Sequence, residues 1–375
     1  MKRIAIIIQR YLPLLGGMEL QTHAQVSHLV GEAFEIHVIT RKYRRLPAFE
    51  VLDGVNIHRV PIFGPKASAS LSYTFGALNL LRHLQPDLIH AHELLSASTI
   101  GTLAKRLWGW PLVITPHRSG SIGDVQRLHQ KFLGARRMAA IARLGDRFIA
   151  ISQEIADELQ GAGVPAAHLI PIPNGVDVHK FFPGDAARRL VSRKTAGLPA
   201  DGLLTVFSGR LAPEKRVNLL VQVWPQIRAV FPQASLVILG EGSERPALEN
   251  QAGEGVYFAG YVKNVADYLA AADLFVLPSI AEGISGAMLE AMSSGLPVVV
   301  TAVGAAPQVI THGENGWLIP PDDREALRES LLHLLGNAAL RERLGHAARR
   351  HIEEHYAMTA VTKRLAQVYR ELIAQ

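Results

Sequence analysis

The chain has 375 residues, is 48% hydrophobic, contains no cysteine and carries a formal net charge of +6. This length is more than one hydrophobic core usually serves, so it predicts two domains of comparable size. The absence of cysteine excludes a disulfide framework and thiol chemistry, and it is compatible with a reducing compartment.

The positive charge belongs to the first half of the chain. Residues 1–177 hold 19 Lys and Arg against 13 Asp and Glu, whereas residues 178–375 hold 20 of each. Basic residues are densest at 41–45 and from Arg127 to Arg147, where they interleave with apolar residues. A basic amphipathic helix there can lie on an anionic membrane surface, and a solvated face of an ordinary helix explains the pattern equally well.

No apolar run is long enough to cross a bilayer, since Gln9 and Arg10 interrupt the first one. We therefore expect a cytoplasmic protein, with peripheral contact at the inner face of the cell membrane as an open alternative. No nucleic-acid partner is expected.

Strand-like apolar runs alternate with helical stretches along the whole chain. In the first half these runs cover residues 4–8, 36–40, 57–60, 88–90, 112–115 and 147–152, and in the second half residues 203–208, 236–240, 256–259, 274–277 and 297–301. Such alternation is typical of parallel sheets covered by helices on both faces. The sequence thus predicts an α/β protein with two Rossmann-like domains and a ligand cleft between them.

The polar segment 174–200 contains Pro183, Gly184, Gly197 and Pro199, which are typical of a linker. It predicts the domain break, with a first domain at 1–177 and a second at 178–355. Residues 356–375 have the spacing of an amphipathic helix.

Two glycines, Gly16 and Gly17, follow the first predicted strand in the segment LGGMEL. The segment matches neither GxGxxG nor a Walker loop, so dinucleotide binding and NTP hydrolysis are disfavoured. Paired glycines let a ligand approach the backbone closely, and a plain tight turn is the alternative.

The segment SGRLAPEKR follows the strand at 203–208 and supplies cations at the start of a helix. It contains Gly209, Arg210 and Lys215, and we expect both cations to face one crevice. An arginine and a lysine there suit a diphosphate leaving group, whose charge must be neutralised as its bond breaks.

Two carboxylates flank a predicted helix start after the strand at 274–277. Glu282 lies in a loop, and Glu290 lies in the helix expected from about Ser285 to Ser294. Gly283 and Gly286 leave the helix start uncrowded, so its free N–H groups can receive a phosphate. A surface glutamate before an ordinary amphipathic helix is the alternative interpretation.

The ordered set of motifs resembles the retaining nucleotide-sugar glycosyltransferases of family four, which have the GT-B architecture. The set comprises GGxE at 16–19, PNGVD at 173–177, GRxxxEK at 209–215, and two glutamates eight positions apart followed by AMxxGxPVV. The resemblance implies two Rossmann-like domains that face each other across a deep cleft, and a last helix, residues 356–375, that crosses back to the first domain.

Residue roles follow from this resemblance. It implies that Arg210 and Lys215 bind the donor diphosphate, that Glu282 lies beside the donor sugar, and that Glu290 holds the ribose. Backbone N–H groups of the loop contact sugar and phosphate, and this loop comprises Gly283, Ile284, Ser285 and Gly286. Tyr261 and Val262 meet the base, the turn at Gly16 and Gly17 approaches the phosphate, and His117 hydrogen-bonds the donor sugar.

The implied activity is transfer of a hexosyl unit, with retention, from a nucleotide-diphosphate sugar to a hydroxyl of a glycan or lipid-linked acceptor. A UDP-sugar is favoured and GDP-mannose is possible, in synthesis of cell-envelope polysaccharide or lipopolysaccharide. No cofactor or metal is expected, because Arg210, Lys215 and the helix start supply positive charge. His90 and His92 form an HxH pair, but no further acidic or histidine cluster in the sequence completes a ligand set.

The sequence departs from the family pattern at two places. Ala305 to Gln308 replace a second glycine and a glutamate, and Ile284 replaces a common aromatic residue. The donor's identity is therefore less defined than its class. A sugar-nucleotide epimerase and a non-catalytic nucleotide-sugar-binding subunit are the alternative functions.

Overall fold

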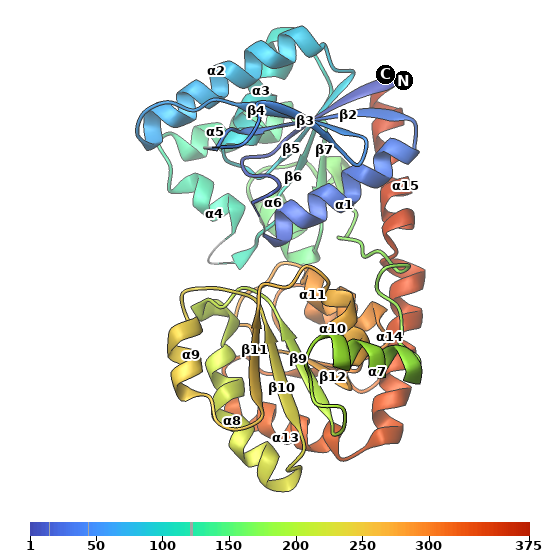
Figure 1. Cartoon of the computed structure of the whole chain (residues 1–375). Coiled ribbons are helices and arrows are strands. Elements are labelled where there is room, and N and C mark those ends of the chain that lie inside the picture. Colours follow the sequence, from blue (N-terminus) through green and yellow to red (C-terminus); the bar gives the residue numbers. More distant parts are fainter. Residues whose placement is uncertain (15, 44, 121–122) are drawn as a thin grey trace. The chain divides into compact units, whose positions relative to one another are not determined.

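A computed structural model describes residues 1–14, 16–43, 45–120 and 123–375, so Leu15 of the LGGMEL segment and Arg44 of the basic run lie outside the described residues (Figure 1). The chain forms two compact units, residues 1–175 with 358–375, and residues 176–357. The unit boundaries are thus 175/176 and 357/358, and the boundaries predicted from the sequence are 177/178 and 355/356. Each unit is an α/β layer structure of the Rossmann-like type and is described by itself.

The first unit contains an eight-stranded sheet with the strand order β3-β4-β2-β1-β5-β6-β7-β8. Its strands are β1 (Lys2–Ile7), β2 (Phe34–Arg41), β3 (Phe49–Leu52), β4 (Val55–Val60), β5 (Leu88–His92), β6 (Leu112–Thr115), β7 (Arg147–Ala150) and β8 (Leu169–Pro171). The apolar residues of β1 from Ile4 to Ile7 are fully buried, as expected for a parallel strand covered on both faces.

One strand pair of this sheet is antiparallel, which the sequence analysis did not predict. β3 pairs with β4 through a hairpin whose turn is Asp53-Gly54, with φ values of 51° and 77°. Asp-Gly is the pair favoured by a two-residue turn with two positive φ angles. The hairpin adds an edge strand without a crossover helix.

Helices cover both faces of the first sheet (Figure 1). They are α1 (Gly17–Gly31), α2 (Lys66–Leu84), α3 (Ser96–Trp108), α4 (Asp124–His129), α5 (Gly134–Leu144), α6 (Gln153–Gly161) and α15 (Met358–Ile373), with a 3₁₀ turn at Ala166–His168. α1 and α15 pack together, and α2, α3, α5 and α4 pack in a row.

The last helix belongs to the core of the first unit although it ends the chain. Val361, Leu365, Tyr369 and Leu372 recur at helical spacing and are buried against strand residues such as Ile4 and Ile36. This contact explains why residues 358–375 group with the first unit.

The second unit contains a six-stranded sheet in which every neighbouring pair of strands is parallel, in the order β11-β10-β9-β12-β13-β14. Its strands are β9 (Leu204–Ser208), β10 (Ser235–Leu239), β11 (Val256–Gly260), β12 (Leu274–Leu277), β13 (Val298–Thr301) and β14 (Trp317–Ile319). The chain crosses from β9 to either side of it, so the loops after β9 and β12 meet at the point where ligands bind in open α/β sheets.

Helices cover this second sheet as well (Figure 1). They are α7 (Ala186–Thr195), α8 (Val217–Val230), α9 (Arg245–Gln251), α10 (Val265–Ala271), α11 (Gly286–Ser293), α12 (Ala306–Val309), α13 (Arg324–Leu335) and α14 (Ala338–His355). A 3₁₀ turn at Pro213–Lys215 precedes α8.

Candidate functional site

The loops after β9 and β12 bring Lys215 and Glu282 together. The backbone N–H of Ile280 donates to the carbonyl of Glu214 at 2.9 Å, which ties the 3₁₀ turn to the loop after β12. Lys215 Nζ then lies 2.5 Å from Glu282 Oε1, and the two side chains are only 17% and 15% exposed. A charge-assisted pair this short holds both groups in place at the carboxyl edge of the sheet.

The Glu282 loop rests against Gly304, which follows β13. Gly304 has a φ of +56°, and a Cβ at this position would lie 2.3 Å from the carbonyl oxygen of Glu282. The N–H of Ala305 donates to the carbonyl of Gly283 at 2.9 Å. Only glycine meets both requirements here, and the sequence analysis did not include Gly304 among the site residues.

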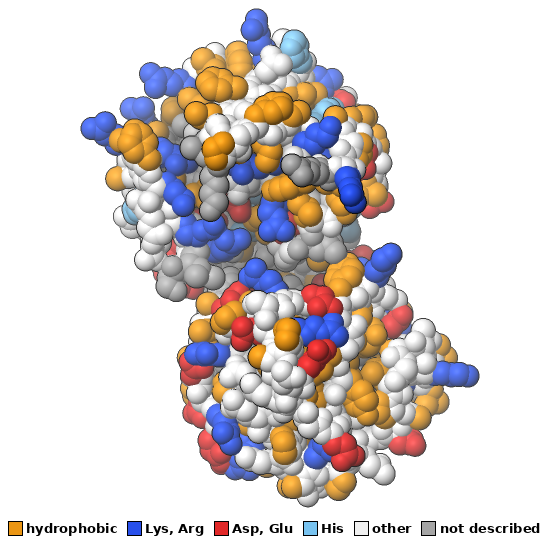
Figure 2. Space-filling view, turned by 60° about the vertical axis from the view of Figure 1, so that its left-hand side comes forward, with side chains coloured by type: hydrophobic (Ala, Val, Ile, Leu, Met, Phe, Trp, Pro, Cys, Tyr) orange, Lys and Arg blue, Asp and Glu red, His pale blue; other side chains and the backbone are white. Residues whose placement is uncertain are grey.

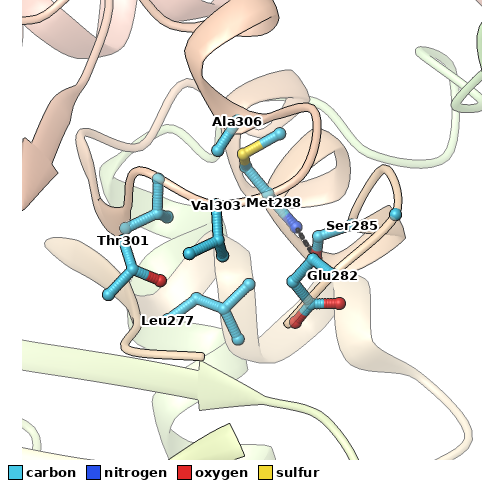
Figure 3. A pocket seen from close by; sticks show the side chains of 9 residues that line it. Leu277, Glu282, Ser285, Met288, Thr301, Val303 and Ala306 are labelled. Atoms are coloured by element: carbon cyan, nitrogen blue, oxygen red, sulfur yellow. Dashed lines mark hydrogen bonds between the residues drawn. The ribbon is translucent and has the colours of Figure 1, made fainter. Parts of the chain in front are cut away.

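A small pocket of about 10 Å³ lies beside Glu282 (Figure 3). It is lined by Leu277, Glu282, Gly283, Ser285, Met288, Val300, Thr301, Val303 and Ala306. Ser285 caps α11, and its hydroxyl accepts a hydrogen bond from the N–H of Met288 at 3.3 Å. Gly286 has open space around it, whereas the side chain of Ile284 is buried. The start of α11 therefore presents its first N–H groups next to Glu282.

Glu290 lies in the second turn of the same helix. Within the described residues no group donates a hydrogen bond to its carboxyl, while Ser294 Oγ donates to its backbone carbonyl at 2.9 Å. Burial raises the pKa of this carboxyl to about 7, and the positive charge of Lys180 opposes part of the rise. A carboxyl with this pKa can both donate to and accept from a hydroxyl near neutral pH.

Arg210 does not join Lys215 at Glu282. Its guanidinium is 71% exposed and donates to Glu214 Oε1 at 2.7 Å, an i,i+4 pair. That Arg210 and Lys215 face one crevice stays a prediction, and Glu214, on the intervening turn, binds the arginine.

The glycines after β9 and β10 permit close backbone contact. Gly240 has a φ of +131°, and a Cβ on it would lie 1.9 Å from the carbonyl oxygen of Gly209. The N–H of Gly209 donates to the carbonyl of Leu239 at 3.0 Å. Further along this edge, Tyr261 is 54% exposed and Val262 is partly buried.

In the first unit, Gly16 and Gly17 start α1. Gly16 is the N-cap in an extended conformation, and its carbonyl accepts from the N–H of Leu20 at 3.0 Å. A Cβ on Gly17 would meet no atom within 4 Å, whereas one on Gly16 would meet the Glu19 carboxylate at 2.3 Å. Neither residue has a positive φ, so backbone strain does not require glycine at either position.

His117 is partly buried after β6, beside the buried side chains of His92 and His90. Its Nε2 lies 2.9 Å from His92 Nδ1, which is also 3.3 Å from Thr22 Oγ1, and its backbone N–H donates to Asp124 Oδ2 at 2.8 Å. Burial, aided by the charge of Arg118, lowers the pKa of the His117 imidazole to about 3. His117 is therefore a neutral ring whose orientation is set by His92.

Both histidines of the HxH pair, His90 and His92, are buried, and His90 contacts hydroxyl groups inside the first unit. His90 Nδ1 lies 2.5 Å from the Tyr369 hydroxyl of α15, and its Nε2 lies 2.6 Å from Thr115 Oγ1. Among residues 1–14, 16–43, 45–120 and 123–375, no three histidine or acidic side chains are placed to hold a metal ion.

Glu93 is a further buried acid that the sequence analysis did not identify. It directly follows β5, is 5% exposed and has a φ of 79°. Burial and the negative charge of Asp124 raise the pKa of its carboxyl to about 7, against the charges of Arg118 and Arg127. The sequence signal that could have identified Glu93 is its position directly after an apolar strand.

The helices of the described segments contain no stretch long and apolar enough to span a bilayer.

Two family models of known proteins match this chain, one mainly in the first unit and one in the second. Residues 15–180 match the family model "Glycosyltransferase Family 4", and residues 203–337 match "Glycosyl transferases group 1". The chain is 30% identical to a D-inositol 3-phosphate glycosyltransferase of Xylanimonas cellulosilytica, over 89% of this chain and 87% of that protein.

Two solved structures share the fold over the full length. Sucrose-phosphate synthase from Thermosynechococcus elongatus superposes with a TM-score of 0.85 at 24% identity, covering 100% of both chains. HepE from Anabaena, solved with UDP-glucose, gives a TM-score of 0.82 at 20% identity, covering 98% and 99% of the two chains. The chain therefore belongs to the group 1, family 4 glycosyltransferases and has their GT-B fold.

Proposed function

We propose that this glycosyltransferase moves a hexosyl unit from a nucleotide-diphosphate sugar, preferably a UDP-sugar, to a hydroxyl of a glycan or lipid-linked acceptor, with retention of configuration. The observation that carries the proposal is the Lys215–Glu282 pair beside the start of α11, with the Glu290 carboxyl on the same helix. The solved relative that contains UDP-glucose supports the choice of donor.

Each group has a chemical task in this proposal. Lys215 and the N–H groups at the start of α11 neutralise the charge that grows on the diphosphate as the glycosidic bond breaks. When Lys215 turns toward the diphosphate, the Glu282 carboxylate orients the sugar and stabilises the positive charge that develops on it. Glu290 binds the ribose hydroxyls.

Retention without a second enzymic carboxylate points to reaction on one face of the sugar. Hydrolases that retain configuration use a nucleophilic carboxylate across from an acid, whereas Glu282 is engaged by Lys215 and Glu290 is assigned to the ribose. In the proposed step the acceptor oxygen bonds to the anomeric carbon as the bond to phosphate breaks. The leaving phosphate oxygen accepts the acceptor's proton.

We further propose that the reaction needs no metal ion, because Lys215 and the α11 start supply the positive charge. Arg210 is a second cation for the diphosphate once it leaves Glu214, and its exposure leaves it free to move. Activity that is unchanged by a chelator supports this assignment, whereas loss with a chelator and recovery with a divalent cation contradicts it.

Product analysis tests the activity itself. The protein is incubated with UDP-glucose, UDP-galactose, UDP-N-acetylglucosamine or GDP-mannose and a membrane-lipid and glycan extract, and products are read by mass spectrometry. A hexosylated acceptor with stoichiometric nucleotide diphosphate is the expected result. An isomerised nucleotide sugar would identify an epimerase, and binding without turnover a non-catalytic subunit.

A further inference from the structure

The helices on one face of the first sheet carry almost no negative charge. α2, α3 and α5 contain no Asp or Glu at all, and the single acid of α4, Asp124, is fully buried. These helices form a contiguous row, because α3 packs against both α2 and α5, and α5 packs against α4. The four helices of this row therefore expose no acidic side chain.

Arginine and lysine side chains project from this row. Arg82 of α2, Arg106 of α3, and Arg136 and Arg143 of α5 are exposed, as is Lys131 between α4 and α5. On α5 the two arginines lie seven residues apart and share one face of the helix. The outward faces of the row are therefore positively charged.

Large apolar side chains are exposed among these cations. Phe132 is 87% exposed, and Leu71 and Phe75 of α2 are 60% and 68% exposed. Leu71, Phe75 and Arg82 fall on one stripe of α2, since residues four and eleven positions apart share a helix face. Figure 2 shows hydrophobic and basic side chains interleaved over the left part of the upper unit, with few acidic ones there.

This surface differs from the amphipathic helix that the sequence analysis considered between Arg127 and Arg147. The segment forms two helices, α4 and α5, and Arg147 begins β7. Its regularly spaced apolar residues, among them Leu128, Met138 and Ile141, are buried in the core of the unit. The side chains that remain available to a partner are the exposed basic and apolar ones of α2, α3 and α5 and of the turn at Lys131 and Phe132. We call them together the α2–α5 surface.

We infer that the α2–α5 surface docks on a bilayer that contains anionic phospholipid. Lysine and arginine near an anionic headgroup layer are attracted through long-range electrostatics, and exposed phenylalanine and leucine side chains can enter the boundary between headgroups and acyl chains. An acidic protein would match the charge but would leave Phe132, on its exposed loop, without an apolar partner. The inference goes beyond the proposed function, since it concerns only the first unit.

Sedimentation with lipid vesicles tests the inference. The full chain is mixed with vesicles of phosphatidylcholine alone or with added phosphatidylglycerol, at low and at near-physiological salt. Binding is expected only with phosphatidylglycerol, and it should weaken as salt shortens the Debye length from about 30 Å to about 8 Å. Binding that is equal with and without phosphatidylglycerol and at both salt concentrations would overturn the inference. The absence of binding to any vesicle would also overturn it.

Matched double variants locate the surface. Arg136→Glu with Arg143→Glu should lower the partition coefficient by about 25-fold or more, because each cation removed from the surface is worth about fivefold. Phe75→Ser with Phe132→Ser should lower it by a similar factor. The controls, Lys194→Glu with Arg350→Glu and Leu190→Ser with Val191→Ser, change exposed residues of the second unit and should bind as the unchanged chain does.

Two outcomes of the variant series contradict the inference that the α2–α5 surface docks on a bilayer. If the arginine variant fails to bind while the phenylalanine variant binds normally, the surface recognises polyanions without inserting into lipid. If the controls lose as much binding as the surface variants, the location is wrong. UDP binding, measured in solution on every variant, should be unchanged, and this readout keeps docking separate from the donor assignment.

Discussion

Lys215 and Glu282 form a partly buried ion pair of 2.5 Å between two loops that are 67 residues apart in sequence. Neither loop follows the other along the chain, but β9 and β12 are neighbours in the sheet, so their ends adjoin. In the proposed reaction, the cation of this pair neutralises the diphosphate and the carboxylate orients the sugar.

Replacing Lys215 with Ala should weaken UDP binding by about tenfold or more, because one charge-assisted contact with the diphosphate is lost and Glu282 is left to repel it. Isothermal calorimetry with UDP measures the effect. Arg350→Ala, an exposed arginine of α14, is the control and should bind UDP normally. An unchanged dissociation constant for the Lys215 variant would remove Lys215 from the donor site.

Replacing Glu282 with Gln should lower kcat by roughly a hundredfold while UDP binding stays near its original value. The amide keeps the shape of the side chain but loses the charge that stabilises the transition state, and it leaves Lys215 free for the diphosphate. Initial rates of UDP release and UDP calorimetry separate the two effects. Comparable turnover in the variant would defeat the assignment.

Gly304→Ala should displace the Glu282 loop, because the new Cβ would lie 2.3 Å from the carbonyl oxygen of Glu282. Gly313→Ala is the matched control, since Gly313 also has a positive φ, +77°, but has no atom within 4 Å of such a Cβ. Both variants should lose about 1 kcal/mol of stability from backbone strain. Only Gly304→Ala should also weaken UDP binding, and equal binding by both variants would contradict the described packing.

Glu290→Gln should stabilise the protein at high pH and change little at low pH. Burial raises the pKa of Glu290 from 4.5 to about 7, so the folded state holds its proton more tightly than the unfolded state does. This group therefore lowers the free energy of unfolding as the pH rises from about 4.5 to about 7. Urea unfolding should show a gain of about 1–3 kcal/mol at about pH 8 and little difference near pH 4.5. A gain that does not depend on pH would exclude this titration.

His117 should remain neutral over the whole working range, because burial and Arg118 lower the pKa of its imidazole to about 3. Nitrogen NMR of histidine-labelled protein, with the His117 signals assigned by His117→Asn, should show no titration of this ring between about pH 5 and pH 8. A midpoint near 6.5 for His117 would contradict its burial.

The sequence predicted most of the fold because each buried parallel strand is a short apolar run bounded by turn residues. It did not predict β3, β8 or β14, which are three or four residues long and partly exposed, so their hydrophobic signal is weak. The closing helix was predicted from its spacing, and its packing in the first unit is seen in the contacts of Tyr369 and Leu365.

The site was predicted in part for similar reasons. Glu282, Ser285 and Lys215 follow strands whose ends adjoin in a parallel sheet, so their proximity follows from topology. Gly304 and the contact of His92 with His117 could not be predicted, because both depend on residues distant in sequence. The position of Arg210 was also not predictable, since a local partner, Glu214, competes for it.

The measurement that tests the donor site most directly is thermal unfolding of the purified protein with UDP, GDP and ADP and their sugar derivatives side by side. A ligand that binds the folded second unit and not the unfolded chain raises the unfolding temperature, and the rise grows with the logarithm of the ligand concentration relative to its dissociation constant. We predict a clear rise with the uridine series and a smaller one or none with the others, and we predict that Lys215→Ala reduces the rise at the same UDP concentration. No shift with any nucleotide would contradict the assignment of Lys215, Glu282 and Glu290 to a nucleotide-sugar site.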